Sequence, residues 1–245
     1  MKIVGVDIDP TSYLKASQAT ISWAFEGASK YVCAATVHTI MEAYDSSEFR
    51  QIINHADMAT PDGMPLVWLL KIKGYPAQTR VYGPTLMLHI LELASRDKIP
   101  IGLFGGSTAS LTALQKNLSN RYPSLSIDYV YSPPFRELSG EEDNQICVEI
   151  INSGVRILFV GLGCPKQERW MAAHKDKLNV VMLGVGAAFD FHSGIKSQAP
   201  AWMQNAGLEW FFRFLNEPLR LWRRYLWHNP RFIILAIADL LGFIH

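Results

Sequence analysis

Short apolar runs rich in β-branched residues recur along the chain, with helix-length segments between them. The runs cover residues 3–8, 31–35, 99–104, 126–131, 156–160 and 180–185, and the segments between them cover 11–28, 39–54, 64–73, 85–97, 108–121, 140–152 and 165–177. Continuous apolar runs are typical of strands buried on both faces, and strands that alternate with helices form parallel sheets. The pattern predicts an α/β fold, Rossmann-like and doubly wound, with a mostly parallel sheet.

The sheet pattern stops near residues 197–202, which divides the chain into a core (1–198) and a helical C-terminal appendage (199–245). In a helix, one apolar stripe of the appendage would comprise Leu208, Phe212, Leu215, Leu219, Trp222 and Leu226, and a second stripe would hold Arg213, Glu217, Arg220 and Arg224. An ordinary amphipathic helix packed on its own core would show this pattern. So would a helix that binds a lipid surface or a lipid diphosphate, because guanidinium groups pair with phosphates.

Composition narrows the class of protein. The net charge of the 245 residues is +1 and the arginine cluster is confined to one end, so nucleic acid is not an expected partner. The first residues lack the zones of a signal peptide, and the apolar run 232–244 is too short to cross a bilayer. We therefore expect a cytoplasmic protein that lies on a membrane rather than through it; a homo-oligomer is compatible with the sequence.

Glycines follow three of the predicted strands, at Gly105-Gly106, at Gly161-Leu162-Gly163 and at Gly184-Val185-Gly186. Loops at the carboxyl ends of parallel strands form the ligand site of such sheets, and backbone N–H groups at helix starts bind phosphate. The dinucleotide motif GxGxxG is incomplete, since Lys166 occupies its third glycine position in the second loop. Together the loops predict a phosphate-bearing ligand, with Asp190 in place to receive a ribose hydroxyl.

Asp62 stands between turn residues just before an apolar helical segment. One interpretation is a helix N-cap, where the helix dipole would lower the pKa of the carboxyl group. The other is a general base, which gains from a pKa nearer neutrality and would need burial to raise it. The sequence leaves both open.

The sequence contains few patterns that are typical of a metal site. Asp7-Ile8-Asp9 resembles the DxD pair of many sugar transferases, but no further carboxylate cluster accompanies it. His38 and His192 lie near loop ends without partners at ligand spacing, so we expect hydrogen bonds from them rather than metal coordination. The prediction is a site with no metal and no cofactor.

Several ordered motifs carry a family resemblance. They are Val37-His38-Thr39, Thr60-Pro61-Asp62-Gly63-Met64-Pro65, Arg80-Val81-Tyr82-Gly83, Gly163-Cys164-Pro165-Lys166-Gln167-Glu168, Phe189-Asp190, Ala199-Pro200-Ala201-Trp202-Met203 and the appendage sequence from Gly207-Leu208-Glu209-Trp210 to Arg223-Arg224-Tyr225-Leu226. Over nearly the whole chain the sequence resembles the WecG/TagA/CpsF glycosyltransferases, glycosyltransferase family 26.

The resemblance implies an inverting, metal-independent transfer of a sugar from a UDP-sugar to a polyprenyl-diphosphate-linked sugar, at the inner face of the cytoplasmic membrane, for cell-surface polymers. Asp62 would be the catalytic base. The substrate-binding residues would be Thr36, Arg80, Gly105, Gly106, Gly163, Lys166, Gln167, Gly186 and Asp190. The lipid diphosphate would bind Arg213, Arg220, Arg223 and Arg224.

One departure bears on the donor. Many members of the family read Thr-Leu-Asn-Val-His-Thr where this chain has Ala34-Ala35-Thr36-Val37-His38-Thr39, so threonine replaces the usual asparagine. N-acetylmannosamine, its uronic acid, glucose and other hexoses all stay open as the transferred sugar.

Two other functions compete. A nucleotide-dependent oxidoreductase is disfavoured by the incomplete glycine motifs. A non-catalytic membrane-associated module, which binds a nucleotide or mediates interactions, would need Asp62 only as a helix cap.

Overall fold

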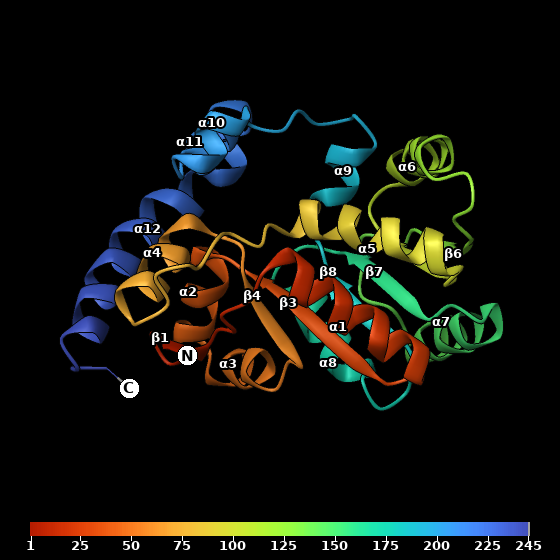
Figure 1. Ribbon diagram of the computed structural model, residues 1–245, viewed down its shortest axis with the longest axis horizontal. Coiled ribbons are helices and arrows are strands. Elements are labelled where there is room, and N and C mark those ends of the chain that lie inside the picture. The colour runs from red at the N-terminus through yellow and green to blue at the C-terminus, as the bar shows by residue number, and fades with distance from the viewer. Residues whose placement is uncertain (245) are drawn as a thin grey trace.

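The computed structural model describes residues 1–244, apart from the side chains of Arg223 and Arg224. At its centre lies a six-stranded sheet in the order β4-β3-β8-β7-β5-β6, in which every neighbouring pair is parallel (Figure 1). The strands are β3 (Lys30–Ala35), β4 (Met58–Pro61), β5 (Ile101–Gly105), β6 (Ile127–Tyr131), β7 (Ile157–Gly161) and β8 (Val181–Gly184). The predicted α/β class with a parallel, doubly wound sheet is confirmed.

Helices cover both faces of the sheet because side chains alternate along each strand. In β7, Phe159 packs with α1 (Tyr13–Glu26), α5 (Gly83–Asp97), α6 (Thr108–Arg121) and α9 (Ala188–His192). Its neighbour Leu158 packs on the opposite face with α2 (Val37–Asp45), α3 (Ser47–Asn54), α4 (Met64–Ile72), α7 (Gly140–Ser153) and α8 (Lys166–His174). Both side chains are fully buried, each stabilising the fold by roughly 1.5–3 kcal/mol.

Local sequence explains where many helices begin and end. Ser139 and Glu142 form a capping box at the start of α7, and Gly154 ends the helix in the left-handed conformation at φ 72°. The single helix predicted over residues 39–54 is wrong: Ser46 is extended, ends α2, and caps α3 with its hydroxyl group.

Two parts of the sheet differ from the sequence prediction. Residues 3–8 do not form one strand; they contribute to a separate antiparallel hairpin of β1 (Lys2–Ile3) and β2 (Val6–Asp7). The chain turns there because Val4 and Gly5 have positive φ angles of 51° and 78°. Strand β4, which the sequence did not predict, is four residues long and lies at the edge of the sheet.

The appendage forms α10 (Ala201–Asn205), α11 (Glu209–Asn216) and α12 (Pro218–Leu240), with α12 packed against α2 (Figure 1). Phe232 and Ala236 join the hydrophobic core from α12. The buried Asp239 lies 2.9 Å from Lys73 Nζ and accepts a hydrogen bond from the N–H of Val4. None of the helices in the described part of the chain combines the length and the apolar character that crossing a bilayer requires.

The predicted apolar stripe of the appendage faces solvent. A break at Glu217 separates α11 from α12, and Leu215, Leu219 and Leu226 are 62%, 92% and 64% exposed. The buried face of α12 carries Leu221 and Tyr225 instead. The interpretation of this stripe as core-facing is therefore wrong, and an apolar surface remains to be explained.

Candidate active site

A cavity of about 1310 Å³ opens at the carboxyl edge of the sheet, between the core and the appendage. Residues that follow β3, β4, β7 and β8 line it, as expected for a parallel sheet. The appendage supplies the opposite wall. Ligand pockets commonly measure roughly 300–1,000 Å³, so this cavity is larger than most pockets for one ligand.

Most of the predicted site residues line this cavity: Thr36, Asp62, Arg80, Gly163, Lys166, Gln167, Gly186, Asp190, Arg213 and Arg220. The side chains of Arg223 and Arg224 lie outside the described residues. Among the residues that the structure describes, the cavity lining does not include Gly105 or Gly106.

Gly105, which ends β5, and Gly106, which follows it, have a packing role. A Cβ on Gly105 would lie 2.6 Å from the carbonyl carbon of Gly161, and Gly105 has a φ of 116°. The N–H of Gly106 donates a hydrogen bond to the carbonyl oxygen of Gly161, at 3.1 Å. Glycine is needed here because β5 and β7 approach closely at the end of their paired segments, where Gly105 lies opposite Gly161.

Asp62 follows β4, where its backbone N–H donates to the carbonyl oxygen of Ala35. Its carboxylate turns away from α4, which begins after Gly63, and accepts a hydrogen bond from the N–H of Gly83 at 2.8 Å. Its other oxygen lies 2.9 Å from Arg80 Nη2. Asp62 is therefore not the N-cap of α4, and this alternative from the sequence is wrong.

The electrostatic surroundings of Asp62 suit a proton acceptor. Burial raises the pKa of the Asp62 carboxyl above its ordinary value, with the negative charge of Glu209 acting in the same direction. Arg80 and the Gly83 N–H oppose this rise without cancelling it. A carboxylate with a raised pKa is a stronger base and accepts a proton more readily.

Arg80 connects the core to the appendage. Its Nη2 lies 2.7 Å from Glu209 Oε2, and its Nε donates to the Asp62 carbonyl. Tyr82 packs its ring against the guanidinium at 4.0 Å and donates its hydroxyl hydrogen to Glu209 Oε1 at 2.9 Å. Glu209 had no predicted role. Its position as an acidic residue in an otherwise apolar and aromatic stretch is the one feature of the sequence that could have indicated a role.

Gln167 fixes two of the glycine loops. Its Oε1 accepts hydrogen bonds from the N–H groups of Gly163 (3.1 Å) and Gly186 (3.0 Å), and its Nε2 donates to Glu168 at 2.8 Å. A Cβ on Gly184 would lie 2.9 Å from that same Nε2. The buried Gln167 amide thus holds the loops after β7 and β8 in a fixed relation at the cavity wall.

Cationic groups gather where the appendage meets the loop after β8. Lys196 Nζ lies 2.9 Å from Asp190 and 3.0 Å from Glu217. Arg220 pairs with Glu217 as well, while the guanidinium of Arg213 lies 6.0 Å from the Phe191 ring. The three cations Lys196, Arg213 and Arg220 outnumber the two carboxylates at this end of the cavity, and guanidinium and ammonium groups are partners that suit a diphosphate.

The acidic pair near the N-terminus serves the fold. Asp9 accepts a hydrogen bond from the N–H of Ala59 at 2.7 Å. Within the described part of the chain, the residue groups with ligand spacing for a metal include neither Asp7 nor Asp62.

His192 forms a hydrogen-bonding contact with the carbonyl of Pro84 at 2.8 Å, as expected. His38, in contrast, has ionisable neighbours that its sequence spacing did not reveal.

A cavity of this size at the carboxyl edge of a parallel sheet, with a buried carboxylate of raised pKa on its wall, defines an α/β enzyme. The chain belongs to the glycosyl transferase WecG/TagA/CpsF family, whose sequence model matches residues 1–244. It is a glycosyltransferase.

Named relatives agree with this assignment. A protein of Bacillus spizizenii is 27% identical over 222 residues, which cover 90% of this chain and 83% of the relative. A protein of Staphylococcus aureus is 28% identical over 225 residues, covering 90% and 86%. Both bear the name N-acetylglucosaminyldiphosphoundecaprenol N-acetyl-beta-D-mannosaminyltransferase.

Proposed function

We propose that this glycosyltransferase moves one sugar from a UDP-sugar to a polyprenyl-diphosphate-linked sugar, with inversion at the anomeric carbon and without a metal. The observation that carries the proposal is Asp62, a buried carboxylate of raised pKa on the wall of the large cavity. The names of the relatives support the lipid-linked acceptor.

In the proposed reaction Asp62 accepts the proton of the acceptor hydroxyl group. The hydroxyl oxygen forms a bond to the anomeric carbon of the donor, and the bond from that carbon to the UDP oxygen breaks. UDP leaves with the bonding electrons, so a single displacement inverts the anomeric configuration. Base assistance of this kind contributes roughly 10²- to 10⁴-fold to the rate.

The departing diphosphate needs positive partners. We assign this role to Lys196, Arg213 and Arg220 and to the backbone N–H groups of the loops after β7 and β8, which Gln167 holds in place. Guanidinium and ammonium groups in a site that excludes water stabilise developing negative charge without proton transfer. The chemistry therefore does not depend on a divalent cation.

The exposed apolar stripe supports a site at the membrane surface. Leu215, Leu219 and Leu226 present side chains to solvent on helices that also carry arginines, and this combination favours binding to the headgroup region of anionic bilayers. A lipid-linked acceptor would reach the cavity from that surface. We place the protein on the inner face of the cytoplasmic membrane for this reason.

For the donor we propose UDP-N-acetylmannosamine first, because the relatives are named for N-acetylmannosaminyl transfer. Thr36 stands where many family members carry asparagine, and it lines the cavity. The uronic acid of N-acetylmannosamine and other hexoses are therefore the alternatives to test beside it.

The test measures UDP release from a panel of UDP-sugars, with and without a short-chain polyprenyl-diphosphate N-acetylglucosamine acceptor, in excess EDTA. The proposal predicts acceptor-dependent release from one donor at an unchanged rate in EDTA. Loss of that activity in EDTA, with recovery on addition of Mg²⁺, would overturn the metal-independent mechanism. Release that ignores the acceptor would overturn the assignment of the acceptor.

A further inference from the structure

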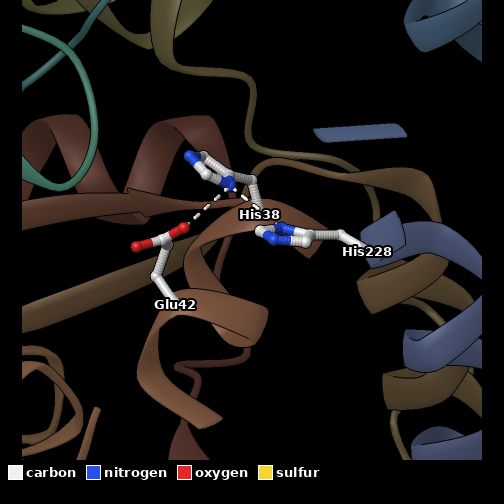
Figure 2. Close-up of side chains that lie close together, drawn as sticks. All are labelled: His38, Glu42 and His228. Carbon is white, nitrogen blue, oxygen red and sulfur yellow. Dashed lines mark hydrogen bonds and ion pairs between the residues drawn. The ribbon is translucent and has the colours of Figure 1, made fainter. Parts of the chain in front are cut away.

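Three ionisable side chains meet where the appendage packs on the core. His38 and Glu42 lie one turn apart on α2, and His228 reaches them from α12 (Figure 2). The Nδ1 atoms of the two histidines are 3.2 Å apart, and Glu42 Oε1 lies 3.6 Å from the Nδ1 of His38. Figure 2 shows both contacts converging on that one nitrogen atom of His38.

The Nδ1 of His38 has two neighbours of different kinds. It lies within hydrogen-bond distance of His228, whereas Glu42 lies at 3.6 Å, an ion-pair distance. A cation between the three groups interacts with all of them together. Two neutral imidazoles and one carboxylate also supply a net negative charge to balance it.

The distances match those of a transition-metal site. Zinc–nitrogen bonds measure about 2.0–2.1 Å, so two nitrogen ligands of a tetrahedral ion lie about 3.3 Å apart. The two Nδ1 atoms are at 3.2 Å, and the three possible ligand atoms all lie within 4.8 Å of one another. Imidazole and carboxylate are the ligands that Zn²⁺ takes in sites with an open fourth position.

The surroundings leave room for an ion and for its fourth ligand. His38, Glu42 and His228 line a hollow of about 770 Å³ on the protein surface. Arg220 lines the same hollow and would oppose a cation, but its guanidinium group is paired with Glu217. The site is half-buried and accessible to water.

A second group of similar composition, formed by Asp143, Cys147 and His174, differs in one respect. The two nitrogen atoms of His174 already contact the carbonyl oxygen of Trp170 (2.7 Å) and the carboxylate of Asp143 (3.0 Å). A metal ion at His174 would therefore have to replace one of these contacts.

We propose that His38, Glu42 and His228 bind one Zn²⁺ ion, with water as the fourth ligand, and that the ion cross-links α2 of the core to α12 of the appendage. The proposed sugar transfer does not use this ion, although His38 and His228 also line the large cavity. It stabilises the packing of two helices whose ligands are 190 residues apart in the chain. The inference is independent of the donor and acceptor assignments.

The experiment titrates tag-free, metal-stripped protein with Zn²⁺ in competition with a chromophoric chelator, and with Co²⁺ to record its d–d absorption. The wild type should bind one ion per chain, show the intense absorption of tetrahedral Co²⁺, and melt at a higher temperature when Zn²⁺ is present. His228→Ala and Glu42→Gln should each lose at least about tenfold in affinity.

The matched control is His55→Ala, which removes an exposed histidine at the end of α3. It should bind Zn²⁺ like the wild type. Circular dichroism checks that each variant is folded, and Glu42→Gln keeps the test valid if His228→Ala does not fold. Equal Zn²⁺ affinity in wild type, His228→Ala and Glu42→Gln would overturn the proposal, as would octahedral Co²⁺ in the wild type.

Discussion

Glu209 of the appendage lies 2.7 Å from Arg80 Nη2, the same nitrogen atom that contacts Asp62 at 2.9 Å. One guanidinium group is therefore shared between a carboxylate of the core and a carboxylate of α11. Because Arg80 also pairs with Glu209, its positive charge stabilises the ionised form of Asp62 less than it would alone. The basicity of Asp62 depends on a helix that lies outside the α/β core.

Replacing Glu209 by glutamine should make Asp62 a weaker base. The charge of Glu209 raises the pKa of Asp62, and its loss also leaves Arg80 wholly to Asp62. The acid limb of the kcat–pH profile, where the base becomes protonated, should move to lower pH, and kcat near neutral pH should fall. Glu141→Gln, at an exposed position of α7, should leave the profile in place. An acid limb that stays or moves upward in Glu209→Gln would contradict this account.

Arg80→Met should destabilise the protein in a pH-dependent way. Removing one partner of a buried ion pair costs about 3–5 kcal/mol, and here two carboxylates lose the same cation. In this variant the pKa of Asp62 in the folded protein would rise further. The stability that Asp62 contributes is therefore fully present below the ordinary pKa of aspartate and is lost as the pH rises through the raised value. Urea unfolding between pH 4 and pH 8 should show the difference from wild type growing with pH. A difference in unfolding free energy that does not change with pH would contradict this prediction.

Gln167→Ala should weaken donor binding through the backbone. The change removes the acceptor for the N–H groups of Gly163 and Gly186, with a loss of about 1–3 kcal/mol in the free energy of unfolding. The KM for the UDP-sugar should rise because the two loops lose their common support. Gln145→Ala removes an exposed amide on α7 and should change neither quantity. An unaltered KM in Gln167→Ala would mean that the loops hold their positions without it.

Leu215→Glu combined with Leu219→Glu should reduce binding to liposomes that contain anionic lipids. Both side chains are exposed, so folding stability should change by less than about 0.5 kcal/mol per site. Cosedimentation measures the binding. Phe25→Glu places the same charge at an exposed aromatic position on α1 and should bind like the wild type. Equal binding by all three proteins would show that another surface meets the membrane.

The order of the elements was predictable because buried strands and amphipathic helices leave different periodicities; α6 covers the predicted residues 108–121. The edge strand β4 left no such signal, since Met58–Pro61 is short and ends in proline. The motifs that carry the family resemblance predicted Asp62, Arg80 and Gln167 as site residues, and all three line the cavity. Glu209 and His228 gain their roles from contacts across 127 and 190 residues, which no local pattern encodes.

Asp62→Asn tests whether Asp62 accepts the proton of the acceptor hydroxyl group. The asparagine side chain keeps nearly the same shape and removes the charge. Binding of the UDP-sugar, followed by calorimetry, should persist, with Asp128→Asn as a control at an exposed position of β6. In a single-turnover assay the rate of transfer by Asp62→Asn should fall by at least about 100-fold. Transfer at the wild-type rate in a folded, donor-binding Asp62→Asn protein would contradict the account.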